Sequence, residues 1–456
     1  MEADMKTLTG RKSSVDLLHG SILKSLVIFA IPLLFSNIFQ QLYNTMDTVI
    51  IGYTLGDEAL AAMGAAGAVY DLLMGFCFGI GNGLSLVTAR SFGSGDMGQL
   101  KKSVATAIVI GAGTMAVITL LARFILYPFL KALHTPPEII DQSYAYVSTI
   151  TWFIAVMFAY NLCSGLLRAI GNSVMPLVFL ILSSVINIIL DLFFITGLGM
   201  GVRGAAVATV IAQGVSVICC LVYIGWKVKI LIPRKIHFTP DGALYKEMLS
   251  QGLSMGFMNC VVGAGTAILQ SGINSLGYLV IAGHTAARKL YQFLNMPFVA
   301  MSHAMSTFIS QNYGAGQVKR IRKAMKCVYL YGAALALIVT LLMLFFAPAM
   351  VRLLSGSRES VVIENGALYL RIVAPALAIL GMINPTRFGL QAIGQKILPI
   401  LSSVIELIGK ILFVAILIPK YQYMAVIFCE PVIWCFMVAE LLTAFWRNPV
   451  IRGEKS

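Results

Sequence analysis

Two acidic residues lie deep inside long apolar stretches of this sequence. Asp47 lies five residues before Gly52, and Asp191 lies six residues before Gly197, where each stretch ends. A carboxylate in hydrocarbon costs roughly 3 kcal/mol or more unless it is protonated, paired or hydrated, so an acid at this depth indicates a function and a partner. Two such acids could bind and release a proton or a Na⁺ ion.

Helix geometry places further polar side chains at the same level. Because a helix rises about 1.5 Å per residue, Asp47 and Asp191 share a depth, and Thr209 reaches it from the next apolar stretch. Asn187 lies one turn from Asp191, and Gln40 lies two turns from Asp47. We therefore predict that these five residues couple transport to a cation. The alternative is that the two acids only hydrogen-bond to lock helix packing.

Composition predicts a membrane protein made of helices. The chain is 59% hydrophobic and 11% charged, with no cleavable signal: its first apolar run is too long and should remain as a span. The apolar stretches predict an all-α polytopic fold with twelve transmembrane helices, near residues 26–51, 59–89, 103–126, 143–167, 175–196, 204–226, 248–273, 279–310, 327–347, 362–391, 399–418 and 424–446.

The distribution of positive charge orients these spans. With the N-terminus in the cytoplasm, most of the 33 Lys and Arg residues fall on the cytoplasmic side, as the positive-inside rule requires. We expect a multi-pass protein of the plasma (inner) membrane with both termini in the cytoplasm. Contact with anionic lipid explains the net charge of +14, so no nucleic-acid partner is expected.

An internal repeat divides the chain into two halves. Residues 55–102 align without gaps with 276–323, and RAIGNSVMP (168–176) matches QAIGQKILP (391–399). Two six-span copies of the same orientation are typical of transporters that work by alternating access, although duplication for stability alone is the alternative. The predicted parts are a tail (1–24), an N-lobe (25–228), a linker (229–246), a C-lobe (247–446) and a second tail (447–456).

Several motifs resemble one transporter family. The pattern P-x14-D from Pro32 to Asp47, the following GYTLGDEAL, the segment QNYGAG after the eighth span and INIILDLFFITGLGMGVRGAAVAT across spans five and six resemble the multidrug and toxic compound extrusion (MATE) transporters. The resemblance implies two pseudo-symmetric six-helix lobes in a V shape that export amphipathic, often cationic compounds against an inward H⁺ or Na⁺ flow.

The resemblance also implies roles for single residues. The DinF-like branch of the family has its cation-coupling cluster at the positions matched by Asp47, Asn187, Asp191 and Thr209, and a bend at the position of Pro32. A proline inside a helix removes one backbone hydrogen bond and gives the helix a place to flex. We expect a monomer that needs no cofactor and no metal, apart from H⁺ or Na⁺ at the two acids.

The C-lobe departs from the NorM-like branch, which has a carboxylate in span seven and another in span ten. In this chain the aligned part of span seven, GFMNCVVGAG, and residues 373–386 of span ten contain neither Asp nor Glu, and the C-lobe spans carry basic residues instead. Lys410 has Glu406 one turn away, which predicts a self-neutralised structural pair. Arg371 and Arg387 lie near span ends and are expected to extend their charges toward the surface.

Other residues are candidates for a substrate cavity. Asp71 falls near the midplane and could attract a cationic drug; Arg288, Tyr70 and Tyr291 are the other predicted contacts. The alternatives are a hydrogen bond in helix packing for Asp71 and pairing with a carbonyl or acid for Arg288. The glycines of GFCFGIGNG (75–83) favour close helix packing over a nucleotide-binding loop.

The sequence therefore predicts a secondary active multidrug exporter that antiports H⁺ or Na⁺. The alternative is a lipid-linked oligosaccharide flippase of the same superfamily, which would use cationic residues in its cavity. An enzyme is not expected, because no nucleophile and base and no metal-ligand spacing emerge.

Overall fold

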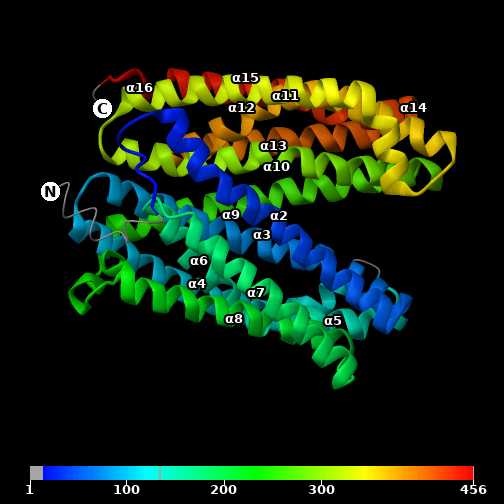
Figure 1. Ribbon diagram of the computed structural model, residues 1–456, viewed down its shortest axis with the longest axis horizontal. Helices are drawn as coiled ribbons and strands as arrows, with labels where there is room; N and C mark the ends of the chain where they lie inside the picture. The colour runs from blue at the N-terminus through cyan, green and yellow to red at the C-terminus, as the bar shows by residue number, and fades with distance from the viewer. Residues whose placement is uncertain (1–13, 133–134, 455–456) are drawn as a thin grey trace. The chain divides into compact units, whose positions relative to one another are not determined.

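A computed structural model describes residues 14–132 and 135–454, which form helices and no strands (Figure 1). The helices are α2 (Ile22–Leu55), α3 (Asp57–Gly93), α4 (Met97–Ala132), α5 (Pro137–Trp152), α6 (Ile154–Ala169), α7 (Val174–Leu192), η1 (Phe193–Gly197), α8 (Gly201–Lys227), η2 (Lys229–Leu231), η3 (Lys235–Phe238), α9 (Gly242–Asn274), α10 (Tyr278–Gly314), α11 (Val318–Ser355), α12 (Ser360–Ala392), α13 (Ile397–Leu412), η4 (Phe413–Leu417), α14 (Ile418–Tyr421), α15 (Tyr423–Arg447) and α16 (Pro449–Arg452).

The all-α polytopic fold is confirmed. Within the described ranges, 10 helices are long and apolar enough to cross a membrane, and the pair α5 and α6, bent by 52° at Phe153, makes an eleventh span. The remaining long helix, α10, has 37 residues but carries polar and charged side chains such as the buried His284 and the half-buried Arg288. With it, the helices correspond to the twelve predicted spans.

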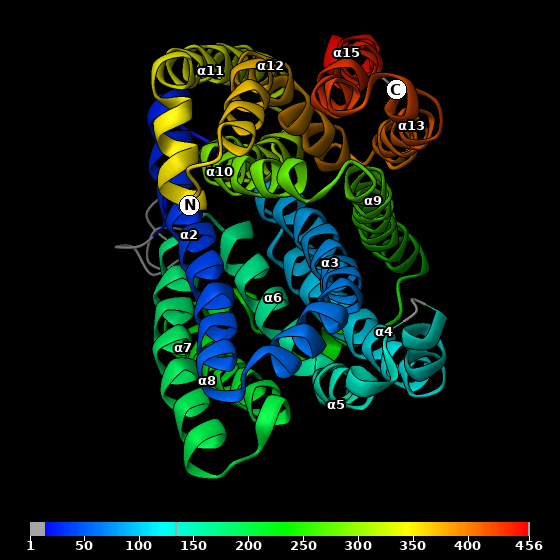
Figure 2. The same ribbon diagram turned by 90° about the vertical axis from the view of Figure 1, so that its right-hand side faces the viewer.

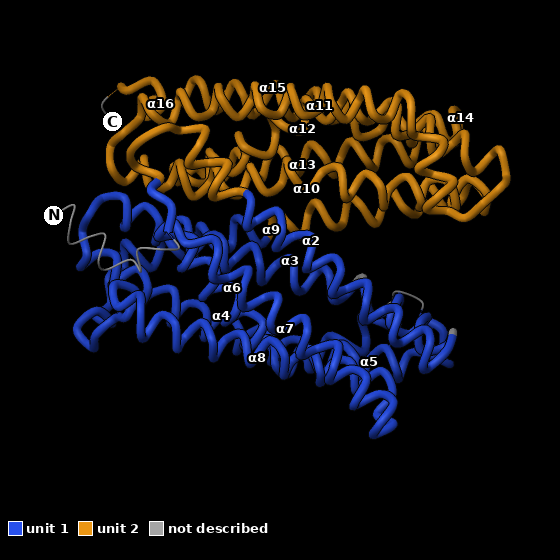
Figure 3. Tube along the Cα trace, viewed as in Figure 1, with its two compact units in different colours: residues 1–16, 31–256 blue, residues 17–30, 257–456 orange. Residues whose placement is uncertain are grey.

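The chain forms two compact units (Figure 3). Unit 1 contains residues 1–16 and 31–256, and unit 2 contains residues 17–30 and 257–456. These bounds differ from the predicted lobes at two places. The linker 229–246 and the first part of the predicted C-lobe, residues 247–256, belong to unit 1. The linker does so because η2 and η3 pack against α4. The start of α2, up to Ala30, is part of unit 2, because side chains of unit 2 hold the segment before it.

The segment that precedes α2 is held by side chains of α10 and the start of α11. Arg320 donates hydrogen bonds to the carbonyl oxygens of Gly20 at 2.9 Å and His19 at 3.0 Å. Asn312 donates to the carbonyl oxygen of Leu17 at 3.0 Å. Because Asn312 and Arg320 lie in the second repeat, residues 17–30 join unit 2, although α2 continues into unit 1.

The helices of each unit pack in the same order. In unit 1, α3 packs against α4, α5 and α6, and α8 packs against α5, α6 and α7. In unit 2, α12 packs against α10, α11, α13 and α15, so it takes the place that α5 and α6 share in unit 1 (Figure 2). Helices α3 and α10 begin and end 221 residues apart, the offset of the sequence repeat.

Turn glycines show why the repeat is visible in the sequence. Gly95 and Gly316, each just after a long helix, have φ values of 77° and 68°. Side chains rarely tolerate this left-handed conformation, so glycine is the default residue at both positions. The matching turns explain the shared Gly residues that aligned the two halves.

The glycines of residues 75–83 serve close helix packing, as predicted. A Cβ added to Gly79 would lie 2.6 Å from the Cα of Gly256, and one added to Gly83 would lie 2.7 Å from the Cα of Gly252. The backbones of α3 and the first half of α9 therefore touch within unit 1. Small residues permit this approach between membrane helices.

Candidate functional site

Three buried side chains of unit 1 form the centre of the predicted coupling site. Asp47 of α2 is 4% exposed, and Asn187 and Asp191 of α7 are fully buried. With its amide oriented so that the nitrogen faces the two acids, the orientation that satisfies its hydrogen bonds, Asn187 donates to Asp47 Oδ1 at 2.8 Å and to Asp191 Oδ2 at 3.2 Å. One amide thus bridges two acids from two helices, which places their charges in direct electrostatic contact.

Hydroxyl groups complete the cluster on its other side. Thr209 of α8 lies 3.5 Å from the Asn187 amide and accepts a hydrogen bond of 3.0 Å from the Tyr43 hydroxyl. Tyr43 and Thr209 are also buried. The equal-depth argument therefore brought together Asp47, Asn187, Asp191 and Thr209, as predicted.

Gln40 does not join this cluster. Its side chain donates to Asn44 Oδ1 at 3.4 Å, at an exposed part of α2. Tyr43, which the sequence analysis did not single out, takes the corresponding place. It lies one turn before Asp47, so the i, i+4 spacing from the acid was the signal that could have found it.

The cluster can accept a small cation. Asp191 Oδ1 is buried and has no hydrogen-bond partner among the described residues. Two carboxylates, an amide and a hydroxyl supply oxygen donors of the kind that bind Na⁺. A proton could bind there instead, because two ionised carboxylates this close repel each other and binding one proton removes that repulsion. The residues therefore fit either ion.

A cavity of about 450 Å³ opens beside these residues within unit 1. Its lining includes Asp47, Thr209 and Tyr43 together with two predicted substrate contacts, Tyr70 and Asp71. The volume lies in the range of cavities that bind drug-sized ligands. Asp47 and the predicted substrate acid, Asp71, thus face one space.

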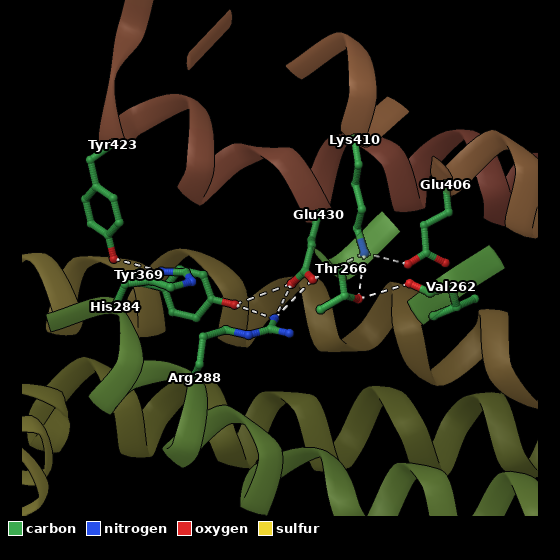
Figure 4. Close-up of polar contacts among 9 residues, drawn as sticks. All are labelled: Val262, Thr266, His284, Arg288, Tyr369, Glu406, Lys410, Tyr423 and Glu430. Atoms are coloured by element: carbon green, nitrogen blue, oxygen red, sulfur yellow. Dashed lines mark hydrogen bonds and ion pairs between the residues drawn. The ribbon is translucent and has the colours of Figure 1, made fainter. Parts of the chain in front are cut away.

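Unit 2 contains a buried charge network instead (Figure 4). Lys410 of α13 lies 2.9 Å from Glu406 Oε1 and 4.0 Å from Glu430 Oε1 of α15. Glu430 in turn pairs with Arg288 of α10 at 2.9 Å, and Arg387 of α12 lies 3.7 Å from Glu406. This network, defined as these five residues, joins four helices of unit 2.

The network corrects two sequence predictions. Glu406 and Lys410 do form the predicted pair, but the pair is not isolated. Arg387 does not extend its charge to the surface: it is 6% exposed, and its Nε donates to Ser402 Oγ at 2.9 Å. The physical reason is that α12 continues to Ala392, which leaves Arg387 inside the helix and facing α13. Arg371, by contrast, is exposed as predicted.

Glu430 is the residue that the sequence analysis missed. It stands within an apolar stretch, FCEPVIW, so the argument applied to Asp47 would have found it. Arg288 pairs with Glu430, which agrees with the predicted alternative that it pairs with a carbonyl or an acid. Its guanidinium also lies 4.9 Å from the Tyr291 ring centroid. Neither residue lines the cavity beside Asp47.

Comparison with known proteins identifies the family. The MatE family model matches residues 32–193 and 255–416, one match in each sequence repeat. The chain belongs to the MatE family. The MATE resemblance drawn from the motifs is therefore confirmed, and so is the prediction of a transporter in place of an enzyme.

Relatives of this MATE transporter cover most of its length. The chain is 29% identical over 306 residues to "Probable multidrug resistance protein YpnP" of Bacillus subtilis (strain 168), which covers 67% of this chain and 68% of the relative. It is 23% identical to "Multidrug export protein MepA" of Staphylococcus haemolyticus (strain JCSC1435), over 94% of this chain and 92% of the relative.

Solved structures support the fold of the MATE transporter. "Outward-facing conformation of a multidrug resistance MATE family transporter of the MOP superfamily" has a TM-score of 0.85 at 21% identity and covers 96% of this chain and 98% of that chain. "Crystal structure of MATE in the bent conformation" has a TM-score of 0.84 at 21% identity, with 94% and 96% covered. The assignment to the DinF-like branch remains a prediction.

Proposed function

We propose that this MATE transporter exports amphipathic, cationic drug-like compounds in exchange for H⁺ or Na⁺. It acts by alternating access as a monomer in the plasma membrane, in contact with lipid and with both termini in the cytoplasm. Relatives named as multidrug resistance and multidrug export proteins support the substrate class. The two repeats, each with its own six-span unit, support alternating access.

One observation carries the proposal: the paired acids Asp47 and Asp191, bridged by Asn187, lie beside a cavity that also contains Asp71. Acids on one cavity wall attract a cationic compound. A proton or Na⁺ that arrives at Asp47 and Asp191 removes negative charge from the same wall, so the coupling ion and the drug compete. A ligand shifts a conformational equilibrium only by its different affinity for the two states, and this competition supplies that difference.

The flippase alternative is less well supported. A pyrophosphate-linked substrate needs uncompensated cations, whereas the cavity beside Asp47 is lined by the acids Asp47 and Asp71. In unit 2, Lys410 and Arg387 are paired with Glu406. The exporter therefore fits these residues better.

The test compares Asp47→Asn and Asp191→Asn with the wild type in proteoliposomes. The amide keeps the shape of the side chain but cannot exchange a proton or neutralise Na⁺. We expect the uptake of a cationic dye driven by an imposed pH or Na⁺ gradient to fall at least roughly tenfold, to its rate without a gradient. Asp141→Asn, which alters an exposed acid, is the matched control and should behave as the wild type.

Gradient-driven uptake by Asp47→Asn at the wild-type rate, for equal amounts of folded protein, would show that the pair is structural. The separate use of pH and Na⁺ gradients identifies the coupling ion.

A further inference from the structure

A second cavity of unit 1 lies between α4 and α5, apart from the coupling site. Its volume is about 310 Å³, and it shares no lining residue with the cavity beside Asp47. Figure 2 shows α4 and α5 side by side. The polar and aromatic side chains that line it are Thr119 and Arg123 of α4 and Tyr144, Ser148, Thr151 and Trp152 of α5.

Arg123 brings a positive charge into this cavity, and no acid balances it. Its guanidinium lies 5.4 Å from the centroid of the Trp152 ring. No Asp or Glu lines the cavity, and none in residues 14–132 and 135–454 forms an ion pair with Arg123. The described part of the protein therefore does not supply the anion that this cation calls for.

The charge lies inside the border of the membrane. Arg123 is three residues before the end of the predicted span 103–126, which is about 4.5 Å along the helix. A helical side chain leans toward the N-terminus of its helix, which for α4 is the direction of the membrane interior. Trp152, which the guanidinium contacts, lies nine residues inside the span 143–167. The side chain thus extends away from the nearer membrane border, where an unpaired cation is costly.

The surface around the cavity is apolar and exposed. Beside Arg123 on α4, Leu120 is 60% exposed and Phe124 is 67% exposed. Trp152, which lines the cavity, is 56% exposed, and the next residue, Phe153, is 50% exposed. In a membrane span, such side chains contact the acyl chains of lipids. An anion that reaches Arg123 from this surface must therefore carry acyl chains of its own.

The polar lining fits a phosphate that carries a polyol headgroup. A guanidinium binds two phosphate oxygens with parallel N–H groups. Thr119 donates to the Thr151 carbonyl oxygen at 3.4 Å, and Ser148 donates to the Ala145 carbonyl oxygen at 3.3 Å. Because these protons are used within the protein, the two hydroxyl oxygens can accept hydrogen bonds from the hydroxyl groups of a ligand. The lining has no acid for the ammonium group of a zwitterionic headgroup.

We propose that this cavity binds one anionic phospholipid of the phosphatidylglycerol type. Its phosphate pairs with Arg123, its glycerol hydroxyl groups donate to Thr119 and Ser148, and its acyl chains lie along Phe124 and Phe153. With both termini in the cytoplasm, as proposed above, the lipid belongs to the outer leaflet. The site takes no part in the proposed exchange of drug and ion, so lipid binding requires neither.

The test measures contact between a lipid and Trp152. The purified full-length protein is placed in bilayer nanodiscs, and its tryptophan fluorescence is quenched by lipids with brominated acyl chains, which act only at short range. The quenching that is absent in Trp152→Phe belongs to Trp152. We expect brominated phosphatidylglycerol to bind beside Trp152 roughly tenfold or more tightly than brominated phosphatidylcholine with the same chains, the range for a charge-assisted contact.

Variants of the lining assign this preference. Arg123→Gln should abolish it, because an amide has no charge to offer the phosphate. Arg203→Gln removes another exposed arginine of unit 1, which does not line the cavity, so it is the matched control and should keep the preference. Ser148→Leu fills the cavity but leaves Arg123 in place, and it should also lose the preference. This variant decides the test if Arg123→Gln does not fold.

Equal binding of the two lipids beside Trp152 in the wild type, or a preference that persists in folded Arg123→Gln or Ser148→Leu, would overturn the proposal. Soluble glycerol 1-phosphate should not compete, because it has no acyl chains; displacement of the lipid by it would also overturn the proposal, by showing a site for a solute. The measurement uses no drug and no gradient, so its failure is distinct from a failure of gradient-driven dye uptake.

Discussion

At the scale of single residues, the coupling cluster depends on groups that carry no charge. The hydroxyl of Tyr43 donates to Thr209, and Thr209 lies beside the amide that bridges the two acids. In a buried site, a polar group without a partner is costly, so each neutral member fixes the orientation of the next. Asn187 can face both acids because Thr209 occupies its other side.

Thr209→Val tests this arrangement. Valine has nearly the same shape but leaves the buried Tyr43 hydroxyl without its acceptor and takes a polar neighbour from the Asn187 amide. We expect a loss of roughly 1–3 kcal/mol in stability, measured as a lower unfolding temperature in detergent, and weaker binding of the coupling ion. Thr209→Ser, which keeps the hydroxyl, should restore both. An unfolding temperature equal to that of the wild type would show that the hydroxyl contributes nothing.

The residue-level predictions succeeded where depth alone decides a contact. Distances counted from the ends of spans located Asp47, Asp191 and Thr209 correctly, because the helical rise is constant. Depth does not say which way a side chain faces, so Gln40 was placed in the cluster and Tyr43 was not. Glu430 and Arg288 meet only through the packing of α15 against its neighbours, which no spacing within one helix reveals.

At the scale of the elements, two glycines hold α3 close to α9. The atoms nearest to a Cβ at Gly79 or Gly83 are backbone atoms, which cannot move aside without shifting a helix. Gly81, between them, has its nearest neighbour at 3.8 Å, an ordinary contact. A substitution at Gly81 is therefore a matched control for substitutions at Gly79 and Gly83.

Gly79→Ala and Gly83→Ala should each destabilise the protein, because the added methyl group overlaps the backbone of α9. We expect roughly 1–3 kcal/mol, the range for overpacking, measured by thermal unfolding in detergent. Gly81→Ala should be close to neutral. Equal unfolding temperatures for all three variants would mean that α3 and α9 are not packed as described.

Helix α2 contains Pro32, the residue at which a bend is predicted. The two units divide between Ala30 and Ile31, directly before Pro32, and Ser36 donates to the Pro32 carbonyl oxygen at 2.9 Å. The missing N–H of a proline weakens a helix at this place. A change in bend at Pro32 would alter the approach of Asp47, in the same helix, to its partners on α7 and α8.

Pro32→Ala should impair transport more than binding. Alanine restores the backbone donor and stiffens α2, but it removes no group that lines the cavity. We expect dye affinity within about twofold of the wild type and gradient-driven uptake lowered roughly tenfold or more. The two measurements use the same purified protein. Equal losses in affinity and uptake would argue against a bend.

At the scale of the whole molecule, the two sequence repeats have different polar residues at matching positions. Counted from the shared prolines Pro176 and Pro399, Lys410 stands at the position of Asn187. Ile268 stands as far before Leu276 as Asp47 does before Leu55. Unit 2 thus has a cation where unit 1 has the bridging amide, and no acid at the position of Asp47.

The sequence repeat predicted the fold, but it did not predict that the two units contain different buried polar residues. Spans, their number and the order of packing follow from hydrophobic length and from the turn glycines, which both halves retain. The buried polar residues differ between the halves, and their pairing across four helices of unit 2 depends on tertiary contacts. The sequence indicated an N-lobe site correctly in its geometry, whereas it indicated only one of the ion pairs of the C-lobe network.

We predict that the coupling ion binds in unit 1 alone. Asp47→Asn should abolish the response of dye uptake to an imposed gradient. Glu406→Gln should lower stability, because Lys410 and Arg387 lose a shared partner, but it should keep the response, since Glu430 and Ser402 still contact these cations. Uptake with and without the gradient is compared for equal amounts of folded protein. An equal loss of the gradient response in both variants would show that unit 2 shares the coupling, because the ion pairs of Glu406 are with Lys410 and Arg387 and not with the residues around Asp47.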